Sequence, residues 1–281
     1  MADDSVRTWF ITGTSRGLGR AFAEEALAAG DRVAATARDP GAVADLVEKY
    51  GDQVLPVRLD VRDRAAVVAA VRHAESELGH IDVLVNNAGY GLAGAVEEVT
   101  EEQVRDQFDT NVFGALWCSQ AVLPLMRQRG TGYIVQVSSV AGLTTYPNLG
   151  MYCASKWALE GFSETLAQEV TPFGITVILL ELGEFRTEWS AGSLVRAEPM
   201  AAYDDILAKR RHGLSGAYAH LQPGDPAAAA RALLEILAAE DKPRRVLLGN
   251  GAATLIPEVY RQRLAEWAKW EKLARSVDFA S

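Results

Sequence analysis

Cysteine and histidine are scarce in this chain, which has two cysteines and four histidines among 281 residues. Cys118 and Cys153 form no CxxC pair, and the histidines are scattered without the spacing of metal ligands. We therefore expect no metal site, because zinc ions in proteins are held by clusters of such residues. Isolated cysteines are typical of small buried side chains in a reducing compartment.

A long hydrophobic run and an excess of basic residues are also missing. The longest apolar stretch, Ile175 to Leu180, has the length of a buried strand and is too short to span a membrane. The acidic start Met1-Ala2-Asp3-Asp4 is unlike a signal peptide. The formal net charge is -9, whereas nucleic-acid binders normally present a basic face. These absences predict a cytoplasmic protein with neither a membrane nor a nucleic acid as its partner.

What the chain does contain is typical of a folded globular protein, with 49 % hydrophobic and 23 % charged residues. Short β-rich segments alternate with longer helical patterns. The expected strands are Thr8 to Thr12, Arg32 to Ala37, Val54 to Leu59, Ile81 to Val85, a fifth strand that includes Ile134 to Val137, Ile175 to Leu180, and Arg245 to Leu248. This alternation predicts one doubly wound α/β domain over residues 1–281, with a parallel sheet of about seven strands and helices on both faces.

Three later segments complete the pattern. Long helices are predicted from about Thr100 to Arg127 and from Tyr152 to Val170. Between residues 183 and 223 no strand pattern is found, and this stretch is too long for a simple connector, so we expect a lid inserted beside a substrate site. A last helix is predicted to begin at Pro257. Its apolar residues at helical spacing, Tyr260, Leu264 and Trp267, are interpreted as a packing stripe.

Glycines cluster directly after the first expected strand, in Thr12-Gly13-Thr14-Ser15-Arg16-Gly17-Leu18-Gly19. Glycine lets the backbone approach a pyrophosphate closely, and the N-terminus of the following helix favours its negative charge. A tight turn would use the same residue type, and the spacing GxxxGxG differs from the GxGxxG pattern of other dinucleotide sites. The position between a strand and a helix favours the dinucleotide site.

Five motifs, in this order along the chain, resemble those of the short-chain dehydrogenase/reductase family. They are TGxxxGxG from Thr12 to Gly19, Asn86-Asn87-Ala88-Gly89 after the fourth strand, Asn111, Ser139, and the YxxxK pair Tyr152 and Lys156. The resemblance covers almost the whole chain. It implies a Rossmann-type fold and hydride transfer between a nicotinamide cofactor and a carbonyl or secondary alcohol, as in hydroxysteroid dehydrogenases and carbonyl reductases.

The same resemblance implies a catalytic set of Asn111, Ser139, Tyr152 and Lys156. Tyr152 and Lys156 share one helix face, and an ammonium beside a phenol is expected to lower the phenol pKa toward the working pH. Ser139 would hydrogen-bond the substrate oxygen, although a turn at a strand end also uses serine. Asn111 would hold a water in a proton relay with Lys156, unless it is a mid-helix asparagine satisfied by backbone.

The end of the second strand bears on the choice of cofactor. NAD enzymes of this fold usually carry an acid there that bonds the ribose 2′-OH, whereas this chain has Ala37 followed by Arg38. Arg16 and Arg38 could clamp a 2′-phosphate, or they could be solvated surface charges. Asp39, followed by Pro40, is interpreted as the start of a helix. NADP(H) is therefore expected, and NAD is less favoured.

The residues expected to bind the cofactor come from every motif of the resemblance and from the loop after the sixth strand. They are Gly13, Ser15, Arg16, Gly17, Leu18, Gly19, Arg38, Asp60, Val61, Asn87, Ala88, Gly89, Tyr152, Lys156, Gly183 and Thr187. That loop departs from the family, because Leu182 stands where many relatives have proline, and Glu184 follows Gly183. Leucine restricts the backbone less than proline does, so a less rigid loop is expected.

These residues predict an NADP(H)-dependent ketoreductase or alcohol dehydrogenase for a largely apolar carbonyl or alcohol, with Tyr152 as general acid/base. The alternative is a non-catalytic protein that senses a nicotinamide cofactor. A methyltransferase also has a glycine loop after its first strand, but the YxxxK pair and Ala37 disfavour it. The resemblance also implies a homodimer or homotetramer that pairs the two long helices, with Trp117, Phe162 and Leu166 as candidate contacts.

Overall fold

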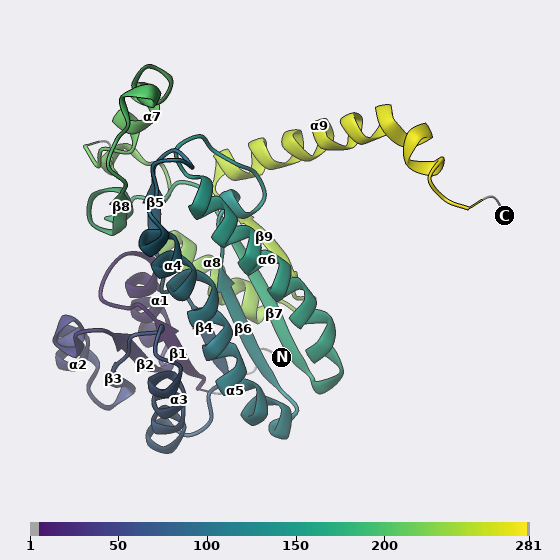
Figure 1. Ribbon diagram of the computed structural model, residues 1–281. Helices are drawn as coiled ribbons and strands as arrows, with labels where there is room; N and C mark the ends of the chain where they lie inside the picture. Colours follow the sequence, from purple (N-terminus) through teal and green to yellow (C-terminus); the bar gives the residue numbers. More distant parts are fainter. Residues whose placement is uncertain (1–5, 218, 280–281) are drawn as a thin grey trace.

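The computed structural model describes residues 6–217 and 219–279 of the chain. Seven strands form one sheet in the order β3-β2-β1-β4-β6-β7-β9, and every neighbouring pair is parallel (Figure 1). The strands are β1 Thr8–Thr12, β2 Arg32–Ala37, β3 Val54–Arg58, β4 Val83–Asn86, β6 Gly132–Val137, β7 Ile175–Leu182 and β9 Arg245–Leu248. The predicted doubly wound α/β fold is confirmed.

Helices cover both faces of this sheet (Figure 1). One core contains residues of α1, α2 and α8, and the other contains residues of α3, α5 and α6. The helices are α1 Gly17–Ala28, α2 Ala44–Tyr50, α3 Arg64–Leu78, α4 Glu101–Phe108, α5 Ala115–Arg129, α6 Gly150–Val170, α7 Asp204–Gly213, α8 Pro226–Ala238 and α9 Asn250–Arg275. Burial on both sides explains why the strands read as nearly continuous apolar runs.

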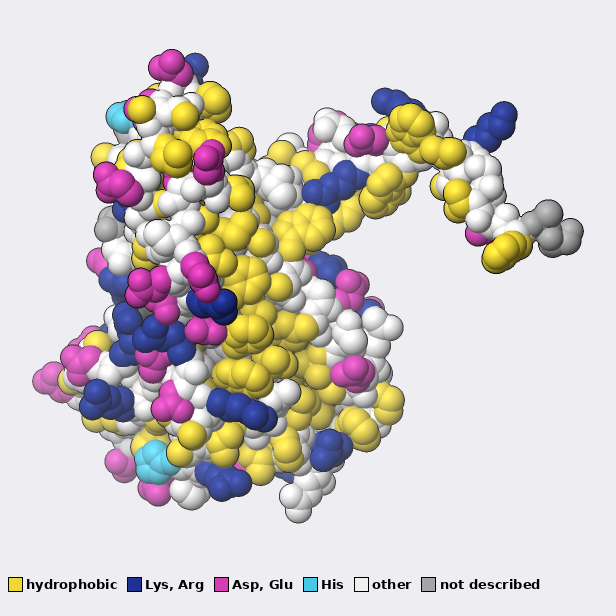
Figure 2. All heavy atoms as spheres, in the orientation of Figure 1, with side chains coloured by type: hydrophobic (Ala, Val, Ile, Leu, Met, Phe, Trp, Pro, Cys, Tyr) yellow, Lys and Arg dark blue, Asp and Glu magenta, His cyan; other side chains and the backbone are white. Residues whose placement is uncertain are grey.

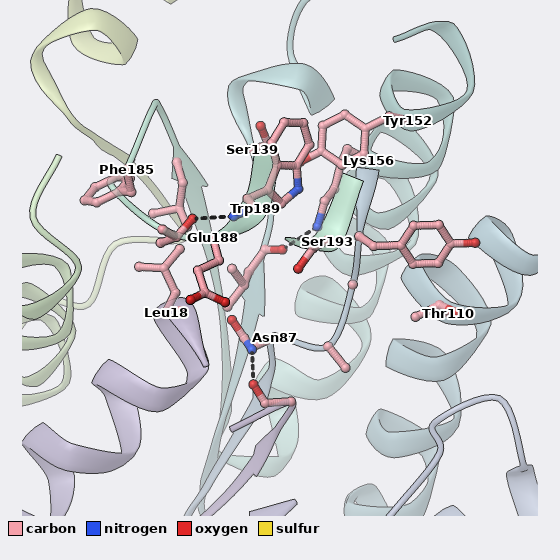
Figure 3. A pocket seen from close by; sticks show the side chains of 18 of the residues that line it. Leu18, Asn87, Thr110, Ser139, Tyr152, Lys156, Phe185, Glu188, Trp189 and Ser193 are labelled. Carbon is pink, nitrogen blue, oxygen red and sulfur yellow. Dashed lines mark hydrogen bonds between the residues drawn. The ribbon is translucent and has the colours of Figure 1, made fainter. Parts of the chain in front are cut away.

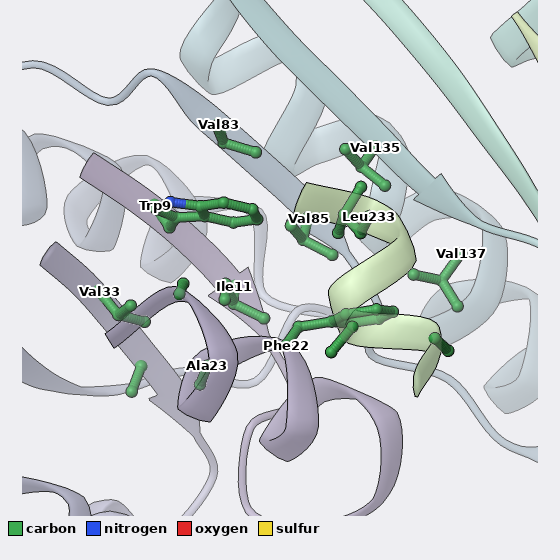
Figure 4. Close-up of a cluster of buried hydrophobic side chains, with 14 of the residues drawn as sticks. Trp9, Ile11, Phe22, Ala23, Val33, Val83, Val85, Val135, Val137 and Leu233 are labelled. Atoms are coloured by element: carbon green, nitrogen blue, oxygen red, sulfur yellow. The ribbon is translucent and has the colours of Figure 1, made fainter. Parts of the chain in front are cut away.

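The first strand shows how alternate residues serve the two cores. Trp9 and Ile11 pack with Phe22 of α1 in one cluster, whereas Phe10 belongs to the cluster on the opposite face (Figure 4). The buried Trp9 indole keeps a hydrogen bond, because its Nε1 donates to Asp31 Oδ2 at 2.8 Å. Both faces of β1 are therefore filled, and its carboxyl end points to the glycine loop.

The predicted helix from Thr100 to Arg127 is one continuous run of helix with an irregular middle. A π-helical turn, Asp109–Gly114, separates α4 from α5. Thr100 and Gln103 form a capping box at the start of α4. A Cβ on Gly114 would lie 2.6 Å from Val61 Cγ2, so the glycine allows this turn to approach the end of β3 closely. Single π-turns of this kind are frequent at functional sites.

Residues 183–223 contain a strand that the sequence pattern did not indicate. β8, Leu194–Arg196, pairs in parallel with β5, Gly91–Ala93, in a separate two-stranded sheet. A π-helical turn, Trp189–Ser193, precedes β8, and α7 follows it. The expectation of no strand was wrong because β8 is only three residues long and pairs with a segment about 100 residues earlier.

The C-terminal helix also differs from the prediction. α9 begins at Asn250, and Pro257 lies inside it. Burial of Ala252 and Ile256 fixes the first turns against the body, which offsets the backbone hydrogen bond that proline removes. Beyond these turns the helix projects away from the sheet (Figure 1). Its stripe is not packed as expected, because Tyr260 is 41 %, Leu264 61 % and Trp267 68 % exposed.

Candidate active site

A cleft of about 720 Å³ opens at the carboxyl ends of the parallel strands, where α/β sheets of this kind bind ligands. It brings together residues from the glycine loop, the ends of β2, β4, β6 and β7, and the segment that follows β7. Of the residues predicted from sequence, the cleft is lined by Gly13, Ser15, Arg16, Gly17, Leu18, Arg38, Asp60, Val61, Asn87, Ala88, Gly89, Ser139, Tyr152, Lys156, Gly183 and Thr187. Gly19 and Asn111 are buried and do not line the cleft.

The glycine loop needs glycine at particular positions. Gly13 and Gly17 have φ values of 73° and 63°, a region that L side chains rarely adopt. A Cβ on Gly19 would lie 2.3 Å from both Gly13 O and Asn87 Nδ2. The Asn87 amide crosses from β4 and donates to Thr12 O at 2.8 Å and to Gly13 O at 3.1 Å. The absence of a side chain at Gly19 therefore permits α1 to pack closely on this loop. That packing holds Gly13 and Gly17 in place.

The far end of the cleft holds a second arginine that the sequence motifs did not indicate, paired with Asp60 and Asp106. Arg38 lines it directly after β2, and Arg62 lies beside it. The Arg62 guanidinium donates to Asp60 Oδ2 at 2.8 Å and lowers the pKa of that carboxyl. Asp39 caps the following helical turn by accepting from Gly41 N at 3.0 Å, as predicted. Sequence reasoning missed Arg62, since no motif marks a residue two positions after the strand-end acid.

Arg16 has partners outside the glycine loop. Its Nη2 donates to Gly192 O at 3.0 Å, and its Nη1 lies 3.8 Å from Glu188 Oε2. These partners belong to the segment after β7, so Arg16 connects the glycine loop to that segment. Arg16, Arg38 and Arg62 all line the cleft, and the clamp of Arg16 and Arg38 stays a prediction.

Ser139, Tyr152 and Lys156 face the same cavity, as Figure 3 shows. Ser139 stands two residues after the end of β6, where its Oγ accepts from Ala141 N at 3.1 Å. Tyr152 and Lys156 lie one turn apart near the start of α6, and both side chains are buried. The Lys156 ammonium donates to Val137 O at 2.8 Å, which fixes it beneath the end of β6.

Burial shifts the pKa of two members of this trio. Burial raises the pKa of Tyr152 to about 12, although a hydrogen bond with Ser139 opposes the shift. Desolvation of the buried phenol is the largest cause of this shift, and the lowering of the Tyr152 pKa by Lys156 stays a prediction. Burial also lowers the pKa of Lys156 to about 8, and the Glu160 carboxylate opposes that decrease. Tyr152 is thus a protonated phenol at neutral pH.

Glu160 belongs to a buried cluster behind the reaction centre. Arg245, on β9, donates to Glu160 Oε2 and to Glu181 Oε1, both at 2.6 Å. The same guanidinium donates to Glu164 Oε2 at 3.0 Å. Burial raises the pKa of Glu160, and the charge of Arg245 opposes this shift. The cluster joins α6, β7 and β9 directly below Lys156, and the sequence motifs gave no sign of it.

The amide of Asn111 is satisfied by the neighbouring backbone. Its Oδ1 accepts from Tyr90 N at 3.0 Å, and its Nδ2 donates to Tyr90 O at 2.9 Å and to Ser155 Oγ at 3.1 Å. This arrangement corresponds to the alternative weighed for a mid-helix asparagine. Asn111 ties the loop after β4 to α6, and so positions the helix that carries Tyr152 and Lys156.

The segment after β7 closes the cleft above the trio. The Trp189 ring lies 5.4 Å from the Tyr152 ring between centroids, and Figure 3 shows the two side by side. A Cβ on Gly91 would lie 2.3 Å from Trp189 Cζ2, so only glycine admits the indole here. Trp189 belongs to the segment that the sequence predicts to form a lid, and it lines the cleft. The contact depends on β5 and β8 being paired.

The backbone at Leu182 is more restrained than we expected from a leucine in the place of proline. It is buried in the core below α8, it is the last residue of β7, and it pairs with Leu248 of β9. Gly183 N then donates to Leu248 O at 2.9 Å. Strand pairing and burial therefore restrain the start of this loop in place of a proline ring. Glu184 follows as an exposed residue at the edge of the cleft.

Comparison with known families agrees with this arrangement. A family described as short chain dehydrogenase matches residues 7–195, which include the glycine loop, Ser139, Tyr152 and Lys156. The chain is 40 % identical to an oxidoreductase, BOA17, of Botryotinia fuckeliana over 96 % of this chain and 98 % of that protein.

Solved structures have the same fold. A short-chain dehydrogenase from Streptomyces avermitilis superposes with a TM-score of 0.92 and 41 % identity, over 99 % of this chain and all of that one. A short chain dehydrogenase/reductase from Burkholderia phymatum in complex with NAD superposes with a TM-score of 0.75 and 27 % identity, over 88 % of this chain and 90 % of that one. The likeness to the first structure extends through the projecting C-terminal helix, because almost nothing of this chain is left uncovered.

Proposed function

This chain belongs to the short-chain dehydrogenase family and is an oxidoreductase, and from that premise we propose that it transfers hydride between NADP(H) and an apolar carbonyl or secondary alcohol. Tyr152 is the general acid in reduction and the general base in oxidation. The observation that carries the proposal is the convergence of Ser139, Tyr152 and Lys156 on one cleft that begins at the glycine loop.

The residues at the cleft fit a dinucleotide. Gly13 and Gly17 adopt positive φ, and a Cβ on Gly13 would lie 3.1 Å from Ala88 Cα, so the loop leaves backbone exposed where a pyrophosphate requires close approach. Arg38 lines the far end directly after an alanine at the position where NAD enzymes of this fold carry an acid, and its guanidinium can hold a 2′-phosphate with two hydrogen bonds. When bound, the cofactor supplies or accepts the hydride.

Ser139 and Tyr152 act on the substrate oxygen. The Ser139 hydroxyl hydrogen-bonds the carbonyl, and so stabilises the negative charge that develops on its oxygen during reduction. Tyr152, whose raised pKa of about 12 keeps the phenol protonated at neutral pH, donates its proton to that oxygen. Lys156, buried one helical turn away, provides positive charge that stabilises the phenolate which remains.

Residues 183–223 serve as a lid on a single Rossmann-type domain in this proposal. The π-helical turn Trp189–Ser193 lies over the glycine loop through the contacts of Arg16, and Trp189 covers Tyr152. Phe185 and Trp189 line the same cleft and give it an apolar side. Such a lid excludes water from the site of hydride transfer, which favours an apolar substrate.

The first prediction concerns cofactor choice. Purified protein should oxidise NADPH in the presence of a panel of apolar ketones, with a higher kcat/KM for NADPH than for NADH. Replacing Ala37→Asp together with Arg38→Ala should reverse this preference, because the new carboxylate repels the 2′-phosphate and bonds the ribose hydroxyl instead. The measurement is the change in nicotinamide absorbance with both cofactors in parallel.

A single substitution, Arg32→Ala, is the matched control, since Arg32 is at the opposite, amino end of the same strand. Equal kcat/KM for the two cofactors in the unmodified protein would contradict the NADP(H) assignment. Tight cofactor binding without turnover of any ketone or alcohol would instead support the sensing protein.

A further inference from the structure

The second half of α9 is an amphipathic helix without a partner in the described chain. Ala252 and Ile256 are buried against the body, whereas the apolar residues on the same face of α9, one to four turns later, are exposed. These exposed residues, here called the arm stripe, are Tyr260, Leu264, Trp267 and Trp270. The stripe is therefore a direct continuation of the face that already packs on the protein (Figure 1).

A helix in this situation requires a partner. Isolated helices of about 12 residues are marginal in water, and their stability in proteins comes from packing of an apolar face. Trp267 and Trp270 are 68 % and 62 % exposed, which is unusual for the largest apolar side chains. Contiguous apolar patches of this kind mark protein or membrane contacts. The arm stripe thus has the properties of one of the two surfaces that form an interface.

The other half lies on the body next to the base of the arm. Trp157 of α6 is 40 % exposed, and the arm contacts the body here because Arg263 Nη1 donates to Leu143 O at 2.7 Å. Arg263 joins this region to the arm, because its guanidinium lies 5.0 Å from the Trp157 ring and 5.4 Å from the Tyr260 ring. Figure 2 shows hydrophobic side chains in an almost continuous band from the underside of the arm over the body.

Charge distinguishes between the possible partners. Residues 250–281 contain five basic and four acidic residues and so have a net charge of +1. Because the whole chain has a net charge of -9, the other 249 residues have a net charge of -10. An acidic body is repelled by anionic membrane surfaces and attracts a weakly basic helix. A second copy of this chain offers both an acidic body and the same exposed aromatic surface.

We propose that the arm stripe of α9 docks on a second copy of this chain, in a twofold dimer in which each arm crosses the other body beside Trp157. A twofold interface brings identical patches together, so one arm and one receiving surface on each chain satisfy both exposed regions at once. Each aromatic residue of the stripe can bury on the order of 100 Å² or more. A standard interface buries roughly 800 Å² per partner, so the stripe supplies part of this area and the receiving surface on the body has to supply the rest. This inference is independent of the proposed chemistry.

The second prediction is its test. Light scattering at micromolar concentration should give a dimer of the 30.3 kDa chain. Trp267→Glu with Trp270→Glu should weaken dimerisation by 100-fold or more in concentration, because two carboxylates would be buried in an apolar contact. Ala265→Glu is the matched control: it adds a carboxylate on the opposite face of the same helix, between Arg261 and Lys269, and should leave the dimer intact.

Far-UV circular dichroism checks that the variants fold. Chemical cross-linking of the unmodified protein is a second test of the dimer, and it needs no variant. After carbodiimide treatment of mixed 14N- and 15N-labelled chains, Lys269 or Lys272 should be joined to acidic residues of the other isotope. A monomeric unmodified protein, a double variant that still dimerises, or arms linked only within one chain would each overturn the proposal. So would monomers that bind phosphatidylserine vesicles through α9.

Discussion

Glu160 is placed to control the charge of Lys156, although no motif of the family includes it. The two residues are one turn apart on α6, and the Glu160 carboxylate opposes the desolvation that lowers the lysine pKa to about 8. Arg245 holds Glu160 in this position through a contact at 2.6 Å. Glu160 is thus a positioning residue that acts through Lys156, and its role rests on the proposed chemistry.

The third prediction follows from this electrostatic link. Glu160→Gln removes the negative charge that raises the Lys156 pKa, so that pKa should fall further below about 8. The kcat for ketone reduction should then decline at a lower pH than in the unmodified enzyme, since the lysine loses its proton earlier. The measurement is the pH profile of kcat, with KM for the cofactor recorded at each pH.

Glu164→Gln is the control for this experiment. Glu164 contacts the same guanidinium at 3.0 Å, but its side chain is 47 % exposed and is not among the groups that shift the Lys156 pKa. If the loss of the contact with Arg245 only disturbed the structure, kcat would fall in both variants at all pH values. Superimposable pH profiles for Glu160→Gln and the unmodified enzyme would show that Glu160 does not act through Lys156.

The residues predicted from sequence are those that form continuous motifs along the chain. Tyr152 and Lys156 are four residues apart on a helix and the glycine loop is continuous, so these spacings, together with the order of the family motifs, predicted a common site, and the structure brings both to one cleft. Arg245 could not be found this way, because it meets Glu160 across 85 residues of sequence. The raised pKa of Tyr152 was also beyond local reasoning, since its largest cause is burial by the whole fold.

At the scale of elements, the short sheet of β5 and β8 fixes the lid against the body. Gly91 and Gly94 of this region face the lid without side chains, and a Cβ on Gly94 would lie 2.7 Å from Ala197 Cβ. The buried Glu98 adds two backbone contacts, accepting from Ala95 N at 2.7 Å and from Met200 N at 2.9 Å. The position of Trp189 over Tyr152 therefore depends on glycine at these close approaches.

The fourth prediction tests that dependence. Gly91→Ala places a methyl group 2.3 Å from the Trp189 indole, which has to move away from Tyr152. We expect a loss of about 1–3 kcal/mol in the free energy of unfolding, as overpacking of a filled core typically costs. The KM for the ketone should rise several-fold, because the lid no longer covers the site. Chemical denaturation and steady-state kinetics measure the two effects.

Gly161→Ala provides the comparison for the same chemical change. A Cβ at Gly161 meets no atom within 4 Å, and the residue lies inside α6. Alanine should stabilise this helix by up to about 1 kcal/mol and leave KM unchanged. If Gly91→Ala behaved like Gly161→Ala in both measurements, the lid would not depend on the close contact at Gly91.

Elements with a strong local pattern were predicted well, and elements defined by distant contacts were not. The strand Thr8–Thr12 has the bounds that its apolar run predicted. β8 is too short to form a pattern, and its existence depends on Gly91–Ala93. The π-helical turn at Asp109–Gly114 keeps helical periodicity nearly unchanged, so the sequence indicated an uninterrupted helix there.

At the scale of the whole molecule, the strand order explains why the site lies where it does. β1 is flanked by β2 and β4, so the chain turns in opposite directions on either side of it, and the cleft opens at this reversal. Helical spacing in α9 predicted an apolar stripe but not its surroundings. Whether such a stripe is covered depends on the direction of the helix relative to the sheet (Figure 1). A local sequence pattern does not determine that direction.

The central claim, hydride transfer to a substrate carbon assisted by Tyr152, is tested most directly by following the hydrogen itself. The fifth prediction uses NADPH deuterated at the transferable nicotinamide position, with a ketone from the panel and mass spectrometry of the product. The unmodified protein should yield an alcohol with one deuterium on the former carbonyl carbon. Tyr152→Phe should lower the yield by roughly 100-fold or more while still binding cofactor, because a positioned acid contributes about this much. An alcohol without deuterium, or no alcohol from any ketone despite bound cofactor, would contradict the account.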